Sequence, residues 1–385
     1  MASAPPELSR ILIAGAGIGG LAAAIALRRH GLDAVVCERA TELREVGAGL
    51  LLSPNAVAVL ALLGLANPAR ERSRVITEWR ILDPRGRPLH RLRPTHGGQP
   101  ALSLHRSDLQ FLLQAQLDPA ALRLGFDVVR HAESRAQVEL TARSGESVRG
   151  AVLVGADGLN SRIRAGLLGE QAPRPCGYVG WRSVVPWIPA GYEGSCLSES
   201  WGEGKRFGIS PLGGNRCYWY ATANQPPRPA GAPAPDPREE LLALFRHWHA
   251  PVSELIAATP AETILRNDIL DRTSGATWTH GRVTLLGDAA HPMSPNLGQG
   301  ACAALEDAWI LARELAATSC WPEGLVRYEK RRRARTAWIT RASHFLGNVI
   351  QLENPAATAM RDAVLRLTPG FCSDWSMRPL FRFQD

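Results

Sequence analysis

The sequence predicts an α/β protein with a Rossmann-type domain, an inserted antiparallel β-sheet domain and C-terminal helices. Three observations lead to this prediction. Residues 11–38 have the pattern of a strand, a glycine turn, a helix and a second strand. Residues 281–309 have the pattern of an apolar strand that ends on Gly-Asp and is followed by a helix. Strands rich in aromatic residues lie between these two stretches. At 385 residues the chain is long enough for two domains.

The domain boundaries are placed where these patterns change. We expect residues 1–175 to form the first part of the nucleotide-binding domain, with small inserted strands. Residues 176–275 are expected to form a β-sheet domain that binds the substrate, including a Pro/Ala-rich surface loop over residues 225–237. Residues 276–385 are expected to return to the nucleotide-binding domain and to add the C-terminal helices.

The N-terminal pattern has the spacing of a dinucleotide-binding motif. Gly15, Gly17 and Gly20 form G-x-G-x-x-G at the start of a helix, with Gly19 as an additional glycine. In order, the three glycines allow a tight turn, the approach of a pyrophosphate and close packing of helix on strand. The helix N-terminus favours phosphate. Glu38 ends the second strand, where a carboxylate binds ribose hydroxyls, which suits FAD or NAD rather than NADP.

The segment between this motif and the β-sheet domain contains several shorter elements. We expect a helix that begins near Ser53, a hairpin around residues 83–86 and a helix capped by Ser107 or Asp108. A further strand ends on Asp157, which precedes a glycine and another helix. These elements complete the first part of the nucleotide-binding domain.

Strands rich in Trp, Tyr and Val over residues 176–224 predict an antiparallel sheet with aromatic faces. Alternation along one of these strands places Cys217 and Trp219 on one face and Tyr218 and Tyr220 on the other. One of the two faces is expected to meet the substrate.

The strand near residue 285 ends on a lone carboxylate, Asp288, and a Gly-Gln-Gly helix start follows at residues 298–300. An NAD dehydrogenase has no need of a second phosphate-and-ribose site so far downstream of the first. The two stretches together therefore favour FAD, with the carboxylate and the helix N-terminus directed at one ligand.

Charge and cysteine usage exclude other classes. The formal net charge is +8, and much of it lies in a run over residues 327–341 that has helical spacing and belongs to no recognisable nucleic-acid fold, so we expect a solvated basic helix face rather than a nucleic-acid site. Seven cysteines without paired spacing predict reduced thiols, a cytoplasmic protein and no metal site. The apolar run over residues 11–27 is explained by strand, turn and helix, so no transmembrane segment is expected.

Three motifs resemble the single-component FAD-dependent aromatic hydroxylases, the p-hydroxybenzoate hydroxylase-like monooxygenases. They are GAGIGG (15–20), VGADGLNSRIR (154–164) and LLGDAAHPMSPNLGQG (285–300), and the likeness covers nearly the whole chain. Within the family the chain most resembles the branch that acts on urate, hydroxybenzoates and alkyl-quinolones. The resemblance implies FAD, NADH or NADPH as reductant, O2, and hydroxylation of an aromatic or heteroaromatic small molecule through a flavin C4a-hydroperoxide. A monomer or homodimer is expected.

The resemblance also implies roles for individual residues. Asp288 would bind the ribityl and pyrophosphate oxygens, the loop from Pro295 would lie against the isoalloxazine, and Asp157 would serve both FAD and nicotinamide. The full set of residues expected to bind FAD is Gly15, Gly17, Gly19, Gly20, Glu38, Arg39, Arg106, Val129, Asp157, Asp288, Pro295, Gly298, Gln299, Gly300 and Ala301.

Arg206 and Tyr218 are the candidate catalytic residues, because related enzymes use a similar arginine and tyrosine to hold and activate the substrate. Tyr218 would hydrogen-bond an acidic O–H or N–H of the substrate, as base or orienting group, with help from Arg206. The structural alternative is a surface arginine and a packed tyrosine. Trp181, Trp219 and Tyr220 are candidate lining residues, although aromatic residues in strands commonly belong to the core.

Three other functions fit parts of the sequence. A flavin halogenase shares the glycine motif, but its W-x-W-x-I-P motif is incomplete in VPWIP (185–189). A non-catalytic, flavoprotein-like binding protein would have no need of the intact downstream flavin loop. Epoxidation of a polyene or isoprenoid uses the same chemistry on an electron-rich alkene and is the enzymatic alternative.

Overall fold

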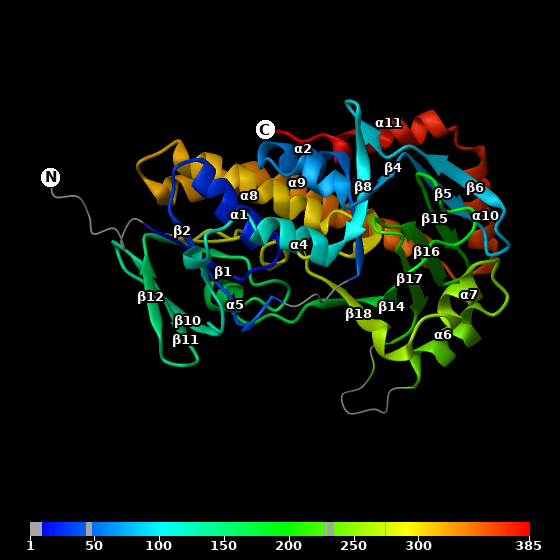
Figure 1. The fold of residues 1–385 in the computed structure, drawn as a ribbon, viewed down its shortest axis with the longest axis horizontal. Helices are drawn as coiled ribbons and strands as arrows, with labels where there is room; N and C mark the ends of the chain where they lie inside the picture. Colours follow the sequence, from blue (N-terminus) through cyan, green and yellow to red (C-terminus); the bar gives the residue numbers. More distant parts are fainter. Residues whose placement is uncertain (1–9, 44–47, 227, 229–234, 274) are drawn as a thin grey trace.

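The computed structural model describes residues 10–43, 48–226, 228, 235–273 and 275–385. Much of the Pro/Ala-rich loop expected over residues 225–237 therefore lies outside the described residues. Figure 1 shows an elongated molecule with the parallel sheet and its helices toward one end and the large antiparallel sheet toward the other. No helix in the described ranges is long and apolar enough to cross a membrane.

A five-stranded parallel sheet forms the centre of the nucleotide-binding domain. Its central strands are short, apolar and buried on both faces, as parallel strands covered by helices require. In spatial order the strands are β19 (Val283–Leu285), β13 (Val152–Gly155), β1 (Ile11–Ala14), β2 (Ala34–Cys37) and β9 (Leu122–Arg123). The downstream strand thus pairs directly beside the strand of the second motif, as the predicted return to this domain requires.

Helices α1 (Ile18–Arg29), α8 (Gly300–Ala316) and α9 (Trp321–Ile350) are layered beside this sheet (Figure 1). The first two pack closely because Gly19 has no side chain. A Cβ on Gly19 would lie 2.6 Å from Leu286 Cδ2 and 3.2 Å from Ala304 Cβ. Gly19 therefore serves the packing of α1 on α8.

Two further helices begin close to the predicted positions. Helix α2 (Pro54–Leu62) has Ser53 as its N-cap, as expected. Helix α4 (Arg106–Gln114) differs, because its N-cap is His105, whose ring accepts a hydrogen bond from the Ser107 backbone N–H. The cap is therefore neither Ser107 nor Asp108, and an imidazole nitrogen acts as the acceptor that a hydroxyl or carboxylate more commonly supplies.

A seven-stranded sheet forms the second domain, and it contains two strands that the sequence placed in the first. The predicted hairpin around residues 83–86 is present, and its first strand pairs in parallel with β15. The spatial order is β18 (Leu265–Asp271), β14 (Arg174–Val185), β17 (Cys217–Asn224), β16 (Lys205–Pro211), β15 (Cys196–Trp201), β5 (Glu78–Leu82) and β6 (Pro88–Leu92).

The two faces of this sheet differ in what covers them. Trp219 and Phe207 are stacked in a core with α6 (Pro237–Phe245) and α7 (Val252–Ala257). The opposite face, which carries Tyr218, borders a cavity shared with the nucleotide-binding domain. The predicted alternation along this strand is therefore confirmed.

Smaller elements complete the chain. A further sheet contains β3 (Gly49–Leu52), β8 (Gln99–His105), β4 (Arg74–Ile76) and β7 (Thr95–His96), and a three-stranded sheet contains β10 (Val128–Glu133), β11 (Val138–Ala142) and β12 (Ser147–Gly150). The remaining helices are α3 (Ala66–Glu71), α5 (Arg162–Leu168), α10 (Pro355–Leu367) and α11 (Gly370–Phe381).

Candidate active site

A hollow at the carboxyl ends of β1 and β2 contains the N-terminal glycine motif. Gly15 has φ of +105°, and a Cβ there would lie 2.5 Å from the Ala156 carbonyl oxygen. A Cβ on Gly20 would lie 1.9 Å from the Gly15 carbonyl oxygen, so the third glycine permits the close helix–strand contact expected of it. Gly17 differs, because no atom lies within 4 Å of the position its Cβ would take. The open space lies where a pyrophosphate would approach the backbone.

Charged side chains surround this hollow. Glu38 Oε2 accepts a hydrogen bond from the Ala16 N–H at 2.7 Å, which holds the carboxylate at the end of β2. Arg39 and Arg106 line the same hollow and supply positive charge. Val129 is exposed on β10, and its neighbour Val128 lines the hollow instead.

Asp157 also borders this hollow, but its carboxylate is used locally. Oδ1 accepts a hydrogen bond from Ser161 Oγ at 2.5 Å, and Oδ2 accepts one from the Arg162 N–H at 2.8 Å. Burial raises the pKa of Asp157, although these hydrogen bonds oppose the rise. The carboxylate therefore organises the start of α5 at the edge of the hollow.

A second cavity, of about 300 Å³, lies between the downstream loop and the antiparallel sheet. The Asp288 side chain is open to the empty space of this cavity, but the cavity is enclosed by protein. This burial removes solvation from the carboxylate and raises the pKa of Asp288. Arg106 lies near enough to oppose that rise, which links the cavity to the first hollow. The loop contributes Pro295, Asn296, Gly298, Gly300 and Ala301 to the wall.

The predicted loop residue Gln299 has its side chain directed away from this cavity. It is 1% exposed, and its amide donates a hydrogen bond to Ser53 Oγ at 3.0 Å. Its carbonyl oxygen accepts one from Asn55 at 3.0 Å. The Gln299 side chain therefore ties the loop over residues 295–301 to α2. This loop is called the flavin loop below, after the role that the sequence predicts for it.

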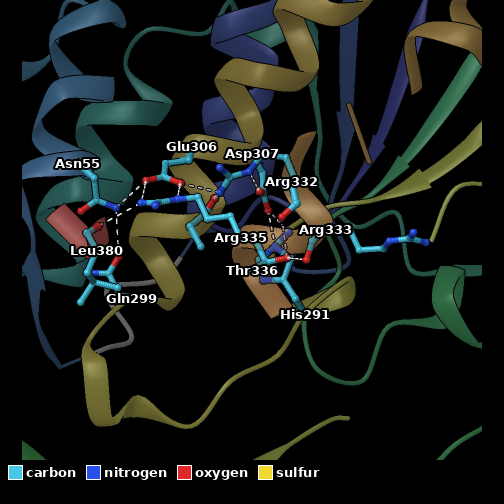
Figure 2. A network of polar contacts seen from close by, with 12 residues as sticks. Asn55, His291, Gln299, Glu306, Asp307, Arg332, Arg333, Arg335, Thr336 and Leu380 are labelled. Carbon is cyan, nitrogen blue, oxygen red and sulfur yellow. Dashed lines mark hydrogen bonds and ion pairs between the residues drawn. The ribbon is translucent and has the colours of Figure 1, made fainter. Parts of the chain in front are cut away.

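The same asparagine begins a buried ionic network behind the loop (Figure 2). Asn55 donates to Glu306 at 2.7 Å, and Arg335 binds both carboxylate oxygens of Glu306 at 2.8 Å. Arg332 lies between two carboxylates, 2.7 Å from Glu306 and 2.7 Å from Asp307. Arg332 is 2% exposed and both carboxylates are fully buried. The expectation of a solvated basic face is therefore wrong here, because α9 turns this arginine toward acidic residues on α8.

Asp307 connects the network to the Gly-Asp turn that carries Asp288. Its Oδ2 accepts hydrogen bonds from the Gly287 N–H at 3.1 Å and from His291 Nε2 at 2.6 Å. His291 is 4% exposed and packs near the Trp278 ring, so it lies inside this network and does not line the cavity. The network therefore positions the turn from behind.

The antiparallel sheet supplies the opposite wall of the cavity. Arg206 on β16 is 2% exposed and donates a hydrogen bond to Asn296 of the flavin loop at 3.1 Å. Its guanidinium lies 3.6 Å from the Glu199 carboxylate and 5.4 Å from the centre of the Tyr220 ring. Tyr220 donates a hydrogen bond to Glu199, and Trp201 donates another at 2.9 Å. The charge of Arg206 is thus compensated inside the wall, and it is not a surface arginine.

Tyr218 lines the same wall, and no hydrogen-bond partner for its hydroxyl is found among the described residues. Burial raises the pKa of Tyr218 to about 12, although the charges of Arg182 and Arg206 oppose this rise. Its phenol is therefore protonated at neutral pH and suited to donating a hydrogen bond. Arg182 is half-buried at the cavity and has no ion-pair partner in the ranges that the structure describes.

The remaining lining is mostly apolar. Trp181 and Trp219 belong to the core on the far side of the sheet, although Trp181 also borders the cavity. Tyr220 faces the cavity. The apolar residues on the cavity side include Leu51, Trp79, Leu197, Ile269 and Met293.

The sequence indicated this wall only in part. Glu199 was missed, because the strand CLSESW has weak aromatic and alternating character, and Asp307 and Arg332 were missed because their partners lie on different helices. Glu199 lies between Ser198 and Ser200, and this polar stretch gave no signal that the carboxylate is buried.

The two hollows together fit FAD. The open backbone at Gly17, beside two arginines, suits a pyrophosphate, and the Glu38 carboxylate suits a ribose. The cavity between Asp288 and the aromatic wall suits a planar ring system. Helices α1 and α8 both begin without a side-chain cap, so their N-terminal N–H groups favour negative charge at these places.

Comparisons with known proteins agree with this geometry. A family model described as FAD binding domain matches residues 9–343. The aurachin C monooxygenase/isomerase of Stigmatella aurantiaca is 40% identical over 361 residues, which cover 93% of this chain and 94% of that protein. The 2-heptyl-3-hydroxy-4(1H)-quinolone synthase of Pseudomonas aeruginosa is 34% identical over 365 residues, with 93% and 94% covered. The crystal structure of Klebsiella pneumoniae HpxO with FAD and uric acid has a TM-score of 0.90 and 29% identity, covering 97% of this chain and 96% of HpxO.

Proposed function

The chain belongs to the FAD binding domain family. We propose that it hydroxylates a fused heteroaromatic of the 4-quinolone kind that carries an apolar substituent. It is a FAD-dependent monooxygenase that uses NADH or NADPH as reductant. The observation that carries the substrate proposal is the shared cavity, in which the flavin loop faces both free polar groups and an apolar wall.

The polar part of the cavity suits a ring that carries hydrogen-bonding oxygens. Glu199 compensates Arg206, so this arginine offers no free positive charge to a carboxylate. The Tyr218 hydroxyl and the Arg182 guanidinium remain as donors for an oxygen on the substrate ring. Leu51, Leu197 and the other apolar side chains provide a place for a hydrocarbon substituent.

Bound FAD would accept hydride from the nicotinamide and activate O2. In our proposal Asp288 and the loop from Pro295 hold the ring system, and the N-terminus of α8 favours negative charge there. The Tyr218 hydroxyl orients the substrate through its oxygen and stays protonated. The Arg206–Glu199 pair gives the wall its shape and helps to exclude water.

A substrate screen tests this function. FAD-loaded protein is given NADH or NADPH with an alkyl-4-quinolone, a hydroxybenzoate, urate or a polyene, and both reductant consumption and product mass are measured. We expect the quinolone to stimulate oxidation of the reductant and to gain one oxygen on the ring. An epoxide from the polyene would favour the alternative reaction. Protein that contains FAD but oxidises reductant with none of these compounds would contradict the substrate class.

A further inference from the structure

Helices α10 and α11 present an apolar surface to solvent at the end of the molecule that carries β6 (Figure 1). Met360, Val364 and Leu367 follow helical spacing on α10, and Phe371 and Trp375 lie one turn apart on α11. These five side chains, here called the C-terminal apolar face, are between 59% and 82% exposed. Large apolar side chains gathered at such exposure indicate an interaction surface.

Arg366 is an exposed charge at the edge of this face on α10, and it lines the basic hollow described below. The exposed residues between the apolar ones are Ala356 and Ala363, while Arg361 is buried and Leu365 packs inward against Ile350. Helix α11 is held to the sheet from its inner side, where Ser373 contacts His90 at 2.7 Å. The helix pair is thus anchored on one side and presents the C-terminal apolar face on the other, with the exposed Arg378 one turn beyond Trp375.

A basic hollow adjoins the apolar face. Phe371 lines it together with four arginines and a single carboxylate, Asp374. Asp374 accepts a hydrogen bond from the backbone N–H of Arg93 at 2.9 Å. Outside the lining, Glu78 pairs with two of the arginines and Asp83 lies 3.6 Å from Arg366. The lining arginines are Arg80, Arg91, Arg93 and Arg366.

We propose that the C-terminal apolar face docks on the surface of an anionic phospholipid bilayer, with Leu367, Phe371 and Trp375 inserted at the interface and the basic hollow against the headgroups. Exposed Trp, Phe and Leu beside arginine are typical of interfacial membrane contacts. The hollow has more arginines than carboxylates, and anionic headgroups complement this excess of positive charge, whereas a second copy of this face would bring another hollow with the same excess to the contact. The formal net charge of +8 favours the same partner.

Vesicle sedimentation with the FAD-loaded full chain tests this surface independently of any substrate. Vesicles of equal parts phosphatidylcholine and phosphatidylglycerol are compared with pure phosphatidylcholine. We expect the wild type to sediment with the mixed vesicles, less with neutral vesicles and less at high salt. Leu367→Asp and Trp375→Asp are each expected to weaken this binding by roughly tenfold or more. Val326→Asp, at an apolar position on α9 that is 58% exposed, is the control and should bind like the wild type.

Each variant is first checked for FAD content and thermal unfolding, so that a folding defect is recognised. Wild type that stays in the supernatant with mixed vesicles would overturn the proposal. So would equal binding by all variants. A dimer in analytical ultracentrifugation that dissociates on Leu367→Asp, without vesicle binding, would assign the face to a second copy instead.

Discussion

Replacing Arg332 with methionine should destabilise the protein strongly, because this side chain is shared by two buried carboxylates. Its guanidinium lies 2.7 Å from Glu306 and 2.7 Å from Asp307. Methionine fills much of the space but leaves the carboxylates without their shared cation. Removing one partner of a buried ion pair costs about 3–5 kcal/mol. Arg335 still holds Glu306, so the larger effect is expected at Asp307 and at the Gly287 turn that it positions.

The neighbouring residue is a matched control. Arg333 pairs with Glu329 at 3.2 Å, one turn away on the same helix, and its side chain is 43% exposed. Arg333→Met should therefore cost less than about 1 kcal/mol. Urea unfolding of both variants, followed by circular dichroism and by FAD release, makes the comparison. Equal destabilisation by the two variants would refute the account of the buried network.

The pH dependence provides a second test of the same carboxylate. Burial by itself would raise the pKa of Asp307, but the charges of His291 and Arg332 outweigh it and lower the pKa from 3.8 to about 2. A lowered folded-state pKa adds stability above the unfolded value, and this stability is lost as the pH falls from about 4 to about 2. Arg332→Met removes one of the charges and so brings the folded-state pKa of Asp307 closer to its unfolded value, and this variant should therefore lose less stability than the wild type as the pH falls from about 4 to about 2.

Three further predictions concern the cofactor and the substrate. Purified protein should be yellow and release intact FAD on denaturation; flavin that stays attached to the chain would contradict non-covalent binding. Asp288→Ala should retain less FAD than Asp157→Ala, because the Asp288 carboxylate opens onto the cavity whereas the Asp157 carboxylate organises the start of α5. Equal FAD content in the two purified variants would contradict these different roles. Tyr218→Phe should bind FAD normally, but its single-turnover rate of hydroxylation should fall by roughly a hundredfold and it should release peroxide. If the variant instead forms as much product per reductant consumed as the wild type, Tyr218 is only a packing residue.

Local patterns in the sequence predicted much of the nucleotide-binding domain. The glycine spacing, the strand ending at Glu38 and the cap at Ser53 depend on neighbours within a few residues, and the structure contains each of them. The alternation around Tyr218 assigned the faces of β17 correctly for the same reason.

Features that depend on long-range contacts could not be read in this way. The hairpin of β5 and β6 joins a sheet whose other strands begin at Arg174, and nothing in its own residues indicates that partner. Arg332 lies in a basic run that is typical of a solvated helix, and only the packing of α9 on α8 shows it to be buried. Glu199 depends likewise on donors from β16 and β17.

The most direct measurement of the central claim uses isotopically labelled dioxygen with an alkyl-4-quinolone and the FAD-loaded protein. The structure places the flavin loop and the donors Tyr218 and Arg182 around one cavity, so oxygen transfer to a ring held there is the predicted outcome. We expect one labelled oxygen atom in the hydroxylated product for each NADH or NADPH consumed. Reductant consumed with all of the label recovered in peroxide and water would contradict the claim.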